Sequence, residues 1–67
     1  MNNLAFPVDH LHALCVRTQR SEADVLEAAA QRQRRSASDA AAALRQYEGT
    51  GYLPRWADEA LTAADAA

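Results

Sequence analysis

Apolar residues recur along the chain at three- and four-residue intervals in four successive stretches, which is the spacing of one face of an α-helix. No stretch alternates strictly between apolar and polar positions, as a half-buried β-strand would. The pattern therefore predicts an all-α fold, a small bundle of about four short helices in a single domain covering residues 1–67. We expect residues 1–5 and 65–67 to be loose, because chain ends have few partners.

The first helix is expected to run from Pro7 to about Thr18. Proline suits a first helical turn because its missing N–H needs no partner there. The carboxylate of Asp9 complements the positive end of the helix dipole. The predicted buried face consists of Val8, Leu11, Leu14, Cys15 and Thr18.

The second helix carries a clear start signal. Ser21 is the expected N-cap, because its hydroxyl can accept a hydrogen bond from a free N–H of the first turn. Glu22 and Asp24 follow it and suit the same end of the helix dipole. The predicted apolar stripe is narrow and consists of Val25, Leu26, Ala29 and Ala30.

The third helix is expected to begin at Ser36 or Ser38, and the sequence does not choose between these two caps. Ser36 followed by Asp39 resembles a capping box, in which two side chains satisfy backbone N–H groups at the helix start. The predicted inner stripe consists of Ala37, Ala40, Ala41, Leu44 and Tyr47. The predicted outer face consists of Ser38, Asp39, Ala42, Arg45 and Gln46.

The end of this third helix has two interpretations. Gly49 is a natural stop, because glycine adopts the left-handed conformation without steric cost. Alternatively, residues 45–54 form a tiny β-hairpin that turns at Gly49–Gly51, like the wing of a winged-helix module. The helical stripe through Leu44 and Tyr47 favours the first interpretation.

The fourth helix is expected over residues 54–64. Its predicted apolar face consists of Leu53, Trp56, Ala57, Ala60, Leu61 and Ala64. Trp56 is the largest apolar side chain in the sequence. We therefore expect it at the centre of the core, packed against Leu44, Leu26 or Tyr47.

Composition bears on the oligomeric state and the compartment. The chain contains 17 alanines but only 11 residues of Leu, Val and Phe, with no Ile. Because so short a chain buries only about 60% of its unfolded surface, we expect a homodimer that supplies the missing apolar contacts. Cys15 is the single cysteine, and no apolar run is as long as a membrane span or a signal peptide. These features predict a soluble, cytoplasmic, bacterial protein.

Charge is distributed unevenly along the sequence. Residues 28–45 carry a net charge of +3, whereas residues 1–27 and 46–67 carry −2 and −3. All seven basic residues are arginine, which reflects either a GC-rich genome or the better fit of guanidinium groups to phosphate and base edges. A basic patch on an acidic chain suits an anionic partner, and nucleic acid is the commonest one.

The second and third helices, separated by a few residues, have the spacing of a helix-turn-helix motif over roughly Ser21–Tyr47. In that motif the start of the second helix enters the DNA major groove, where Arg and Gln read base edges and Ser hydroxyls bind phosphate. This interpretation predicts a dimeric transcription regulator whose partner is double-stranded DNA. The predicted nucleic-acid-binding residues are Arg32, Arg34, Arg35, Ser36, Ser38, Arg45 and Gln46.

Two other interpretations remain open at this point. The arginines near residue 33 can simply offset the negative end of the second helix's dipole. The chain can also be a protein-interaction module, such as an adaptor, antitoxin-like protein or inhibitor, whose acidic C-terminal third engages a basic partner. His10 and His12 point to nearly opposite sides of a helix and cannot share a metal ion. With no catalytic constellation or phosphate-binding loop either, we expect no metal, no cofactor and no enzymatic activity.

Overall fold

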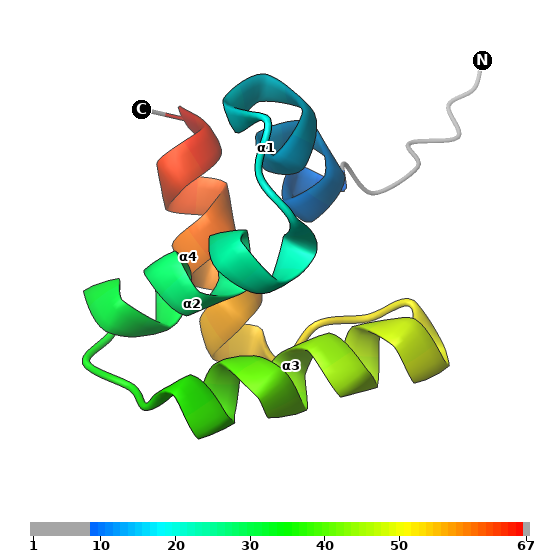
Figure 1. The fold of residues 1–67 in the computed structure, drawn as a ribbon, viewed down its shortest axis with the longest axis vertical. Helices are drawn as coiled ribbons and strands as arrows, with labels where there is room; N and C mark the ends of the chain where they lie inside the picture. The colour runs from blue at the N-terminus through cyan, green and yellow to red at the C-terminus, as the bar shows by residue number, and fades with distance from the viewer. Residues whose placement is uncertain (1–8, 67) are drawn as a thin grey trace, which may run out of the picture.

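The computed structural model describes residues 9–66, which form four α-helices and no strand (Figure 1). The helices are α1 (His10–Thr18), α2 (Glu22–Arg32), α3 (Ala37–Thr50) and α4 (Arg55–Ala66). The all-α prediction is confirmed for this part of the chain. The expected contributions of Pro7 and Val8 to the first helix lie outside the described residues.

Three of the helices begin at a side-chain N-cap. The Asp9 carboxylate accepts the His12 N–H at 2.9 Å, so Asp9 caps α1 directly. The Ser21 hydroxyl accepts the N–H of Asp24 at 3.1 Å and starts α2 as predicted. Each bond satisfies an amide that has no partner inside the helix, which fixes where the helix begins.

The same geometry settles the start of α3. The Ser36 hydroxyl accepts the N–H of Asp39 at 3.2 Å, so Ser36 is the cap. Ser38 lies inside the first turn and is exposed.

The predicted stop of α3 at Gly49 is wrong. The helix continues through Gly49 to Thr50, and Gly51 takes the left-handed conformation with φ 79°. The Gly51 N–H donates to the Tyr47 carbonyl at 2.8 Å and closes the last turn. Residues 45–50 are helical, so the wing-hairpin alternative is also excluded. Two glycines were available, and the hydrogen bond to Tyr47 selects the second.

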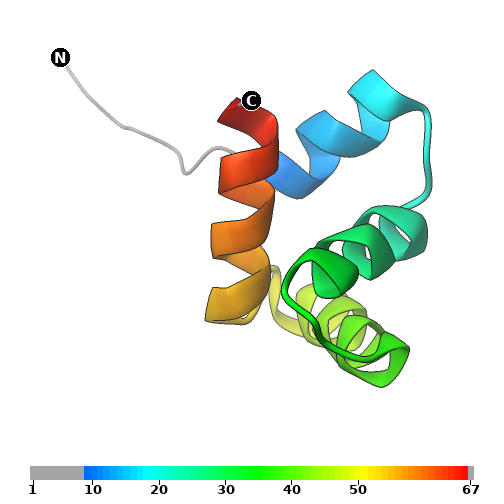
Figure 2. The ribbon, with the colours of Figure 1, turned by 90° about the vertical axis from the view of Figure 1, so that its left-hand side faces the viewer.

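α2 is the central helix of the molecule. It contacts each of the other three helices, and α1 also packs against α4 (Figures 1 and 2). The buried core consists of Leu11, Leu14, Val25, Leu26, Ala29, Ala30, Ala40, Ala43, Ala57, Ala60 and Leu61. The predicted stripe of α2 is therefore confirmed in full.

α3 lies at one edge of the molecule, on the far side of α2 from α1 (Figures 1 and 2). It packs chiefly against α2, and no other helix contacts it to a similar extent. Its two buried residues are Ala40 and Ala43, which we call the alanine seam. Such small side chains let two helices approach closely, at the cost of burying little apolar area.

The predicted inner stripe of α3 is only partly right. Leu44 and Tyr47 pack against the core, but Ala37 and Ala41 are exposed, and Ala43 takes the inner position instead. A single neighbouring helix covers only a narrow strip of α3, so residues slightly off that strip face outward.

Trp56 is not the centre of the core. Its indole is half-buried and packs against the core from one side, and the largest fully buried side chains are Leu11, Leu26 and Leu61. These three leucines come from three different helices and fill the centre of the core between the small alanines. The larger indole of Trp56 lies at the margin of this core.

α4 extends two residues beyond its predicted end. Asp65 lies in its last turn, where its carboxylate contacts His10 Nδ1 at 2.7 Å and the Arg17 guanidinium at 3.1 Å. These contacts join the end of α4 to both ends of α1. They explain why α4 stays helical to Ala66.

Candidate nucleic-acid interface

The joint between α2 and α3 is four residues long, from Gln33 to Ser36. The Arg35 N–H donates to the Ala30 carbonyl at 2.8 Å, and the Arg34 N–H donates to the Gln31 carbonyl at 3.0 Å. This pair of bonds is a Schellman motif, whose left-handed position is usually glycine. Here that position is Arg34, with φ 57°. The tight turn expected between two such helices is therefore made without a glycine.

Arg35 is turned toward α4. Its guanidinium carbon lies 4.8 Å from the centroid of the Trp56 ring, and its Nη1 lies 3.6 Å from the Asp39 carboxylate. A guanidinium over an indole face is attracted by the electrons of the ring. Arg35 therefore holds the joint against α4, and this role in the fold takes it partly out of the predicted interface.

The outward face of α3 is not covered by any described helix. The exposed residues of α3 are Ala37, Ser38, Ala41, Ala42, Arg45, Gln46, Glu48, Gly49 and Thr50. Exposed Arg34 and Ser36 precede it. The Ser36 hydroxyl accepts one hydrogen bond from Asp39 but can still donate its own proton. We call Arg34, Ser36, Ser38, Ala42 and Arg45 the α3 outer face.

Besides Arg35, two more of the predicted site residues have contacts or positions of another kind. The Gln46 amide donates to the Tyr52 carbonyl at 3.3 Å and supports the turn after α3. Arg32 lines a hollow on another side of α2. Of the seven predicted residues, Ser38 and Arg45 are exposed on α3, and exposed Arg34 and Ser36 lie just before it. Arg32, Arg35 and Gln46 have the other contacts described above.

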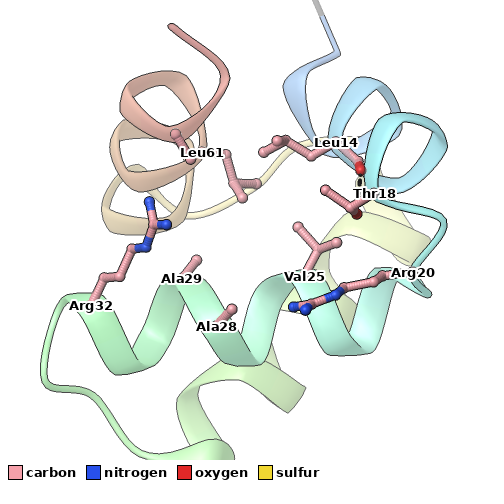
Figure 3. A pocket seen from close by; sticks show the side chains of 9 residues that line it. Leu14, Thr18, Arg20, Val25, Ala28, Ala29, Arg32 and Leu61 are labelled. Carbon is pink, nitrogen blue, oxygen red and sulfur yellow. Dashed lines mark hydrogen bonds between the residues drawn. The ribbon is translucent and has the colours of Figure 1, made fainter. Parts of the chain in front are cut away.

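The hollow beside Arg32 lies between α1, α2 and α4 and has a volume of about 110 Å³ (Figure 3). Its lining consists of Leu14, Thr18, Arg20, Val25, Ala28, Ala29, Arg32, Leu61 and Ala64. Along α2, the lining residues Val25, Ala28 and Ala29 lie between Arg20 at one end of the hollow and Arg32 at the other (Figure 3). Sequence reasoning missed this Arg20–Arg32 hollow. A usable signal was the helical spacing of Val25, Ala29 and Arg32, which places an arginine at the end of an apolar stripe.

A second hollow of about 330 Å³ lies near the start of α1 and the end of α3. The Tyr47 hydroxyl donates to the Asp9 carboxylate there at 2.6 Å. This hydrogen bond, together with burial, raises the pKa of Tyr47 to about 12. Burial acts to raise the pKa of Asp9, but the hydrogen bonds from Tyr47 and the His12 amide outweigh it and lower that pKa. The pair therefore joins α1 to α3 in its neutral-phenol, charged-carboxylate form.

The described residues hold no cluster of three or more His, Cys, Asp or Glu side chains placed to bind a metal ion. His10 pairs with Asp65, and His12 is exposed. Cys15 is half-buried, and burial raises the pKa of its thiol, so the unreactive protonated form is favoured. Within residues 9–66 every helix is too short or too polar to cross a bilayer.

Comparisons with protein-family models, with curated proteins and with solved structures give no significant match.

Proposed function

We propose that the chain is a small, dimeric DNA-binding regulator of the helix-turn-helix type, in which α2 supports α3 and α3 enters the major groove. One observation carries the proposal. α3 lies at the edge of the molecule, packs chiefly against α2, and leaves its outer face uncovered. A recognition helix has to protrude in this way, because a helix covered on several sides cannot enter a groove.

The residues of the α3 outer face suit this role. Ser36, Ser38 and the free N–H groups at the start of α3 provide phosphate donors at the positive end of the helix dipole. Ala42 is small and permits a close approach to the bases. Arg45 lies two turns further along the helix, where a guanidinium reaches a phosphate or a guanine edge.

Asp39 is the one acidic side chain near the start of α3 and would repel phosphate. Its carboxylate lies 3.6 Å from the Arg35 guanidinium, which offsets its charge. In the proposed complex Arg35 and Gln46 are positioning residues. They hold the two ends of α3 through Trp56 and the Tyr52 carbonyl.

The proposed assembly is a two-fold dimer in the cytoplasm. A symmetric dimer presents two copies of α3 to two half-sites and multiplies an otherwise modest affinity. The proposed role is binding, with no catalytic step.

The proposal is tested by fluorescence anisotropy on duplex DNA, starting with the region upstream of the protein's own gene. Arg45→Ala removes one charge from the α3 outer face. Arg17→Ala is the matched control, because Arg17 lies on α1, away from α3, and also carries one charge. We expect Arg45→Ala to lower the salt slope by about one or to relax specificity, and Arg17→Ala to leave both unchanged.

Equal effects of the two substitutions would indicate a diffuse electrostatic attraction and no recognition by α3. If no duplex binds at low salt, the DNA proposal fails, and the acidic protein-interaction alternative takes its place.

A further inference from the structure

The Arg20–Arg32 hollow has a chemical character different from that of the α3 outer face. Its floor is apolar and is built from three helices, with Leu14 on α1, Val25 and Ala29 on α2, and Leu61 on α4. The arginine side chains flank this floor at its two ends (Figure 3). The hollow is therefore an apolar depression between two positive charges.

Both flanking arginines are available to a ligand. Within the described part of the chain, neither guanidinium lies within ion-pairing distance of a carboxylate, whereas Arg17, Arg35 and Arg55 each have a carboxylate partner. Both side chains are exposed. A partner that brings two carboxylates can pair with them without first breaking an ion pair within the protein.

The size of the hollow suits one small apolar group better than a drug-sized ligand. Small-molecule sites usually have volumes of about 300–1,000 Å³, whereas this hollow has about 110 Å³. An engineered apolar cavity of about 150 Å³ holds one benzene molecule. The hollow is thus of the size of one aliphatic side chain, which a macromolecule would have to present.

We propose that the Arg20–Arg32 hollow docks an acidic amphipathic helix of a partner protein. One leucine-like side chain of that helix enters the hollow, and acidic residues about one turn before and after it pair with Arg20 and Arg32. Helix-in-groove recognition uses such anchors, with apolar contacts for affinity and flanking charges for orientation. The hollow lies away from the α3 outer face, so this interaction does not depend on DNA binding.

The probe is a synthetic alanine-rich helical peptide of about 18 residues, long enough to be helical in water. It has one central leucine and glutamates three and four positions to either side. Methyl NMR spectra of the labelled protein are recorded as the peptide is added, with no DNA present. We expect the methyl signals of Leu14, Val25 and Leu61 to shift and to saturate at high micromolar to millimolar peptide.

Charge reversal provides the decisive comparison. The variant Arg20→Glu with Arg32→Glu should bind the glutamate peptide at least tenfold more weakly. It should regain binding to a peptide that carries lysines in place of the glutamates. The matched control is Arg45→Glu with Arg55→Glu, which changes the net charge equally but leaves the hollow intact. This control should bind the glutamate peptide within about twofold of wild type, apart from long-range screening.

Several outcomes would overturn the proposal. These are the absence of methyl shifts at millimolar peptide, equal shifts from a peptide with alanine in place of the leucine, and undiminished binding by the charge-reversed variant. If the charge-reversed variant alone changes the protein's self-association, the hollow is instead a contact between copies of this chain, and the partner-helix proposal is wrong.

Discussion

The Arg35 guanidinium lies over the indole of Trp56 at 4.8 Å from the ring centroid, and this contact joins the α2–α3 joint to the start of α4. It accounts for the half-buried position of Trp56, whose outer face is covered by Arg35. Arg35, one of the three clustered arginines, therefore helps to hold the helices together.

The contact between Arg35 and Trp56 predicts a measurable coupling. Arg35→Ala should destabilise the protein by about 0.5–1 kcal/mol, the usual value of an exposed cation–π pair. Trp56→Ala should cost about 2 kcal/mol, less than the roughly 3–5 kcal/mol of a fully buried aromatic. A double-mutant cycle by chemical denaturation, monitored by circular dichroism, should show that most of the Arg35 effect disappears without the indole. Strict additivity would show that the two groups do not interact in solution.

The left-handed conformation of Arg34 predicts a substitution that separates stability from binding. Arg34→Gly should stabilise the protein by about 0.5–1 kcal/mol, because glycine adopts φ 57° without the Cβ clash. It also removes a charge from the α3 outer face, so DNA affinity should fall although the fold is more stable.

The matched control for Arg34→Gly is Gln19→Gly. Gln19 ends α1 with a similar φ of 56°, but it lies away from α3. The Gln19→Gly substitution should stabilise the protein by the same amount as Arg34→Gly and should leave DNA affinity unchanged. Thermal melts and anisotropy titrations on both variants make the comparison, and unchanged affinity of Arg34→Gly would remove Arg34 from the interface.

The hydrogen bond from Tyr47 to Asp9 predicts a loss of stability at alkaline pH. The pKa of Tyr47 is raised from its ordinary value of 10.0 to about 12 in the folded protein. The bond's contribution is therefore complete below pH 10 and is lost as the pH rises from there through about 12. Tyr47→Phe should cost roughly 0.5–1.5 kcal/mol at neutral pH, the net value of one hydrogen bond.

The measurement is denaturant unfolding of wild type and Tyr47→Phe at several pH values from 7 upward. The gap between their stabilities should narrow across this alkaline window. Tyr52→Phe is the control, because the Tyr52 side chain is 72% exposed, and it should show no such trend. A gap that stays constant with pH would mean that the phenol proton is not shared with Asp9.

The alanine seam predicts that larger side chains are not tolerated on the side of α3 that packs against α2. Ala43→Leu should destabilise the protein by about 1–3 kcal/mol, because the longer side chain forces α3 away from α2. Ala42→Leu should be nearly neutral, since Ala42 is exposed and leucine is a good helix former. The melting temperatures of the two variants distinguish these cases. Equal melting temperatures would mean that Ala43 does not face α2 as the structure shows.

Self-association is expected from the shortage of large buried side chains, because within residues 9–66 the large side chains that are fully enclosed are only Leu11, Leu26 and Leu61. Light scattering should give the mass of a dimer at micromolar concentration, and the melting temperature should rise with concentration. A monomer mass together with a concentration-independent melt would contradict this expectation.

Local signals in the sequence predict much of the fold. Ser21 caps α2 through a hydrogen bond within three residues, and the α2 stripe has the period of a single helix, so the sequence predicted both. For α3 the sequence left Ser36 and Ser38 as alternatives, and only the hydrogen bond from the Asp39 N–H to Ser36 decides between them. The stop at Gly51 depends on one backbone hydrogen bond to Tyr47, and either glycine could have ended the helix in this way. The margin position of Trp56 depends on its contact with Arg35, which is distant in the sequence. These could not be inferred from spacing alone.

The candidate site was predictable as a cluster but not as a surface. Arg32, Arg34 and Arg35 are neighbours in sequence, yet the Schellman turn sends them in three directions: to a hollow, to solvent and to an indole. A turn of a few residues rotates successive side chains by large angles. Net charge therefore locates the patch, while the backbone conformation decides which charges act together.

The separation of α3 into a packed side and an uncovered side bears on how the protein can change over evolution. Positions 40 and 43 are constrained by their fit against α2, whereas positions 38, 42 and 45 are exposed and, in the proposed role, are constrained by the partner they would bind. Substitutions at these outer positions would change the binding specificity without changing the fold. A few substitutions at these positions could therefore produce a new binding specificity on the same fold. The sequences of related chains should differ most at these outer positions.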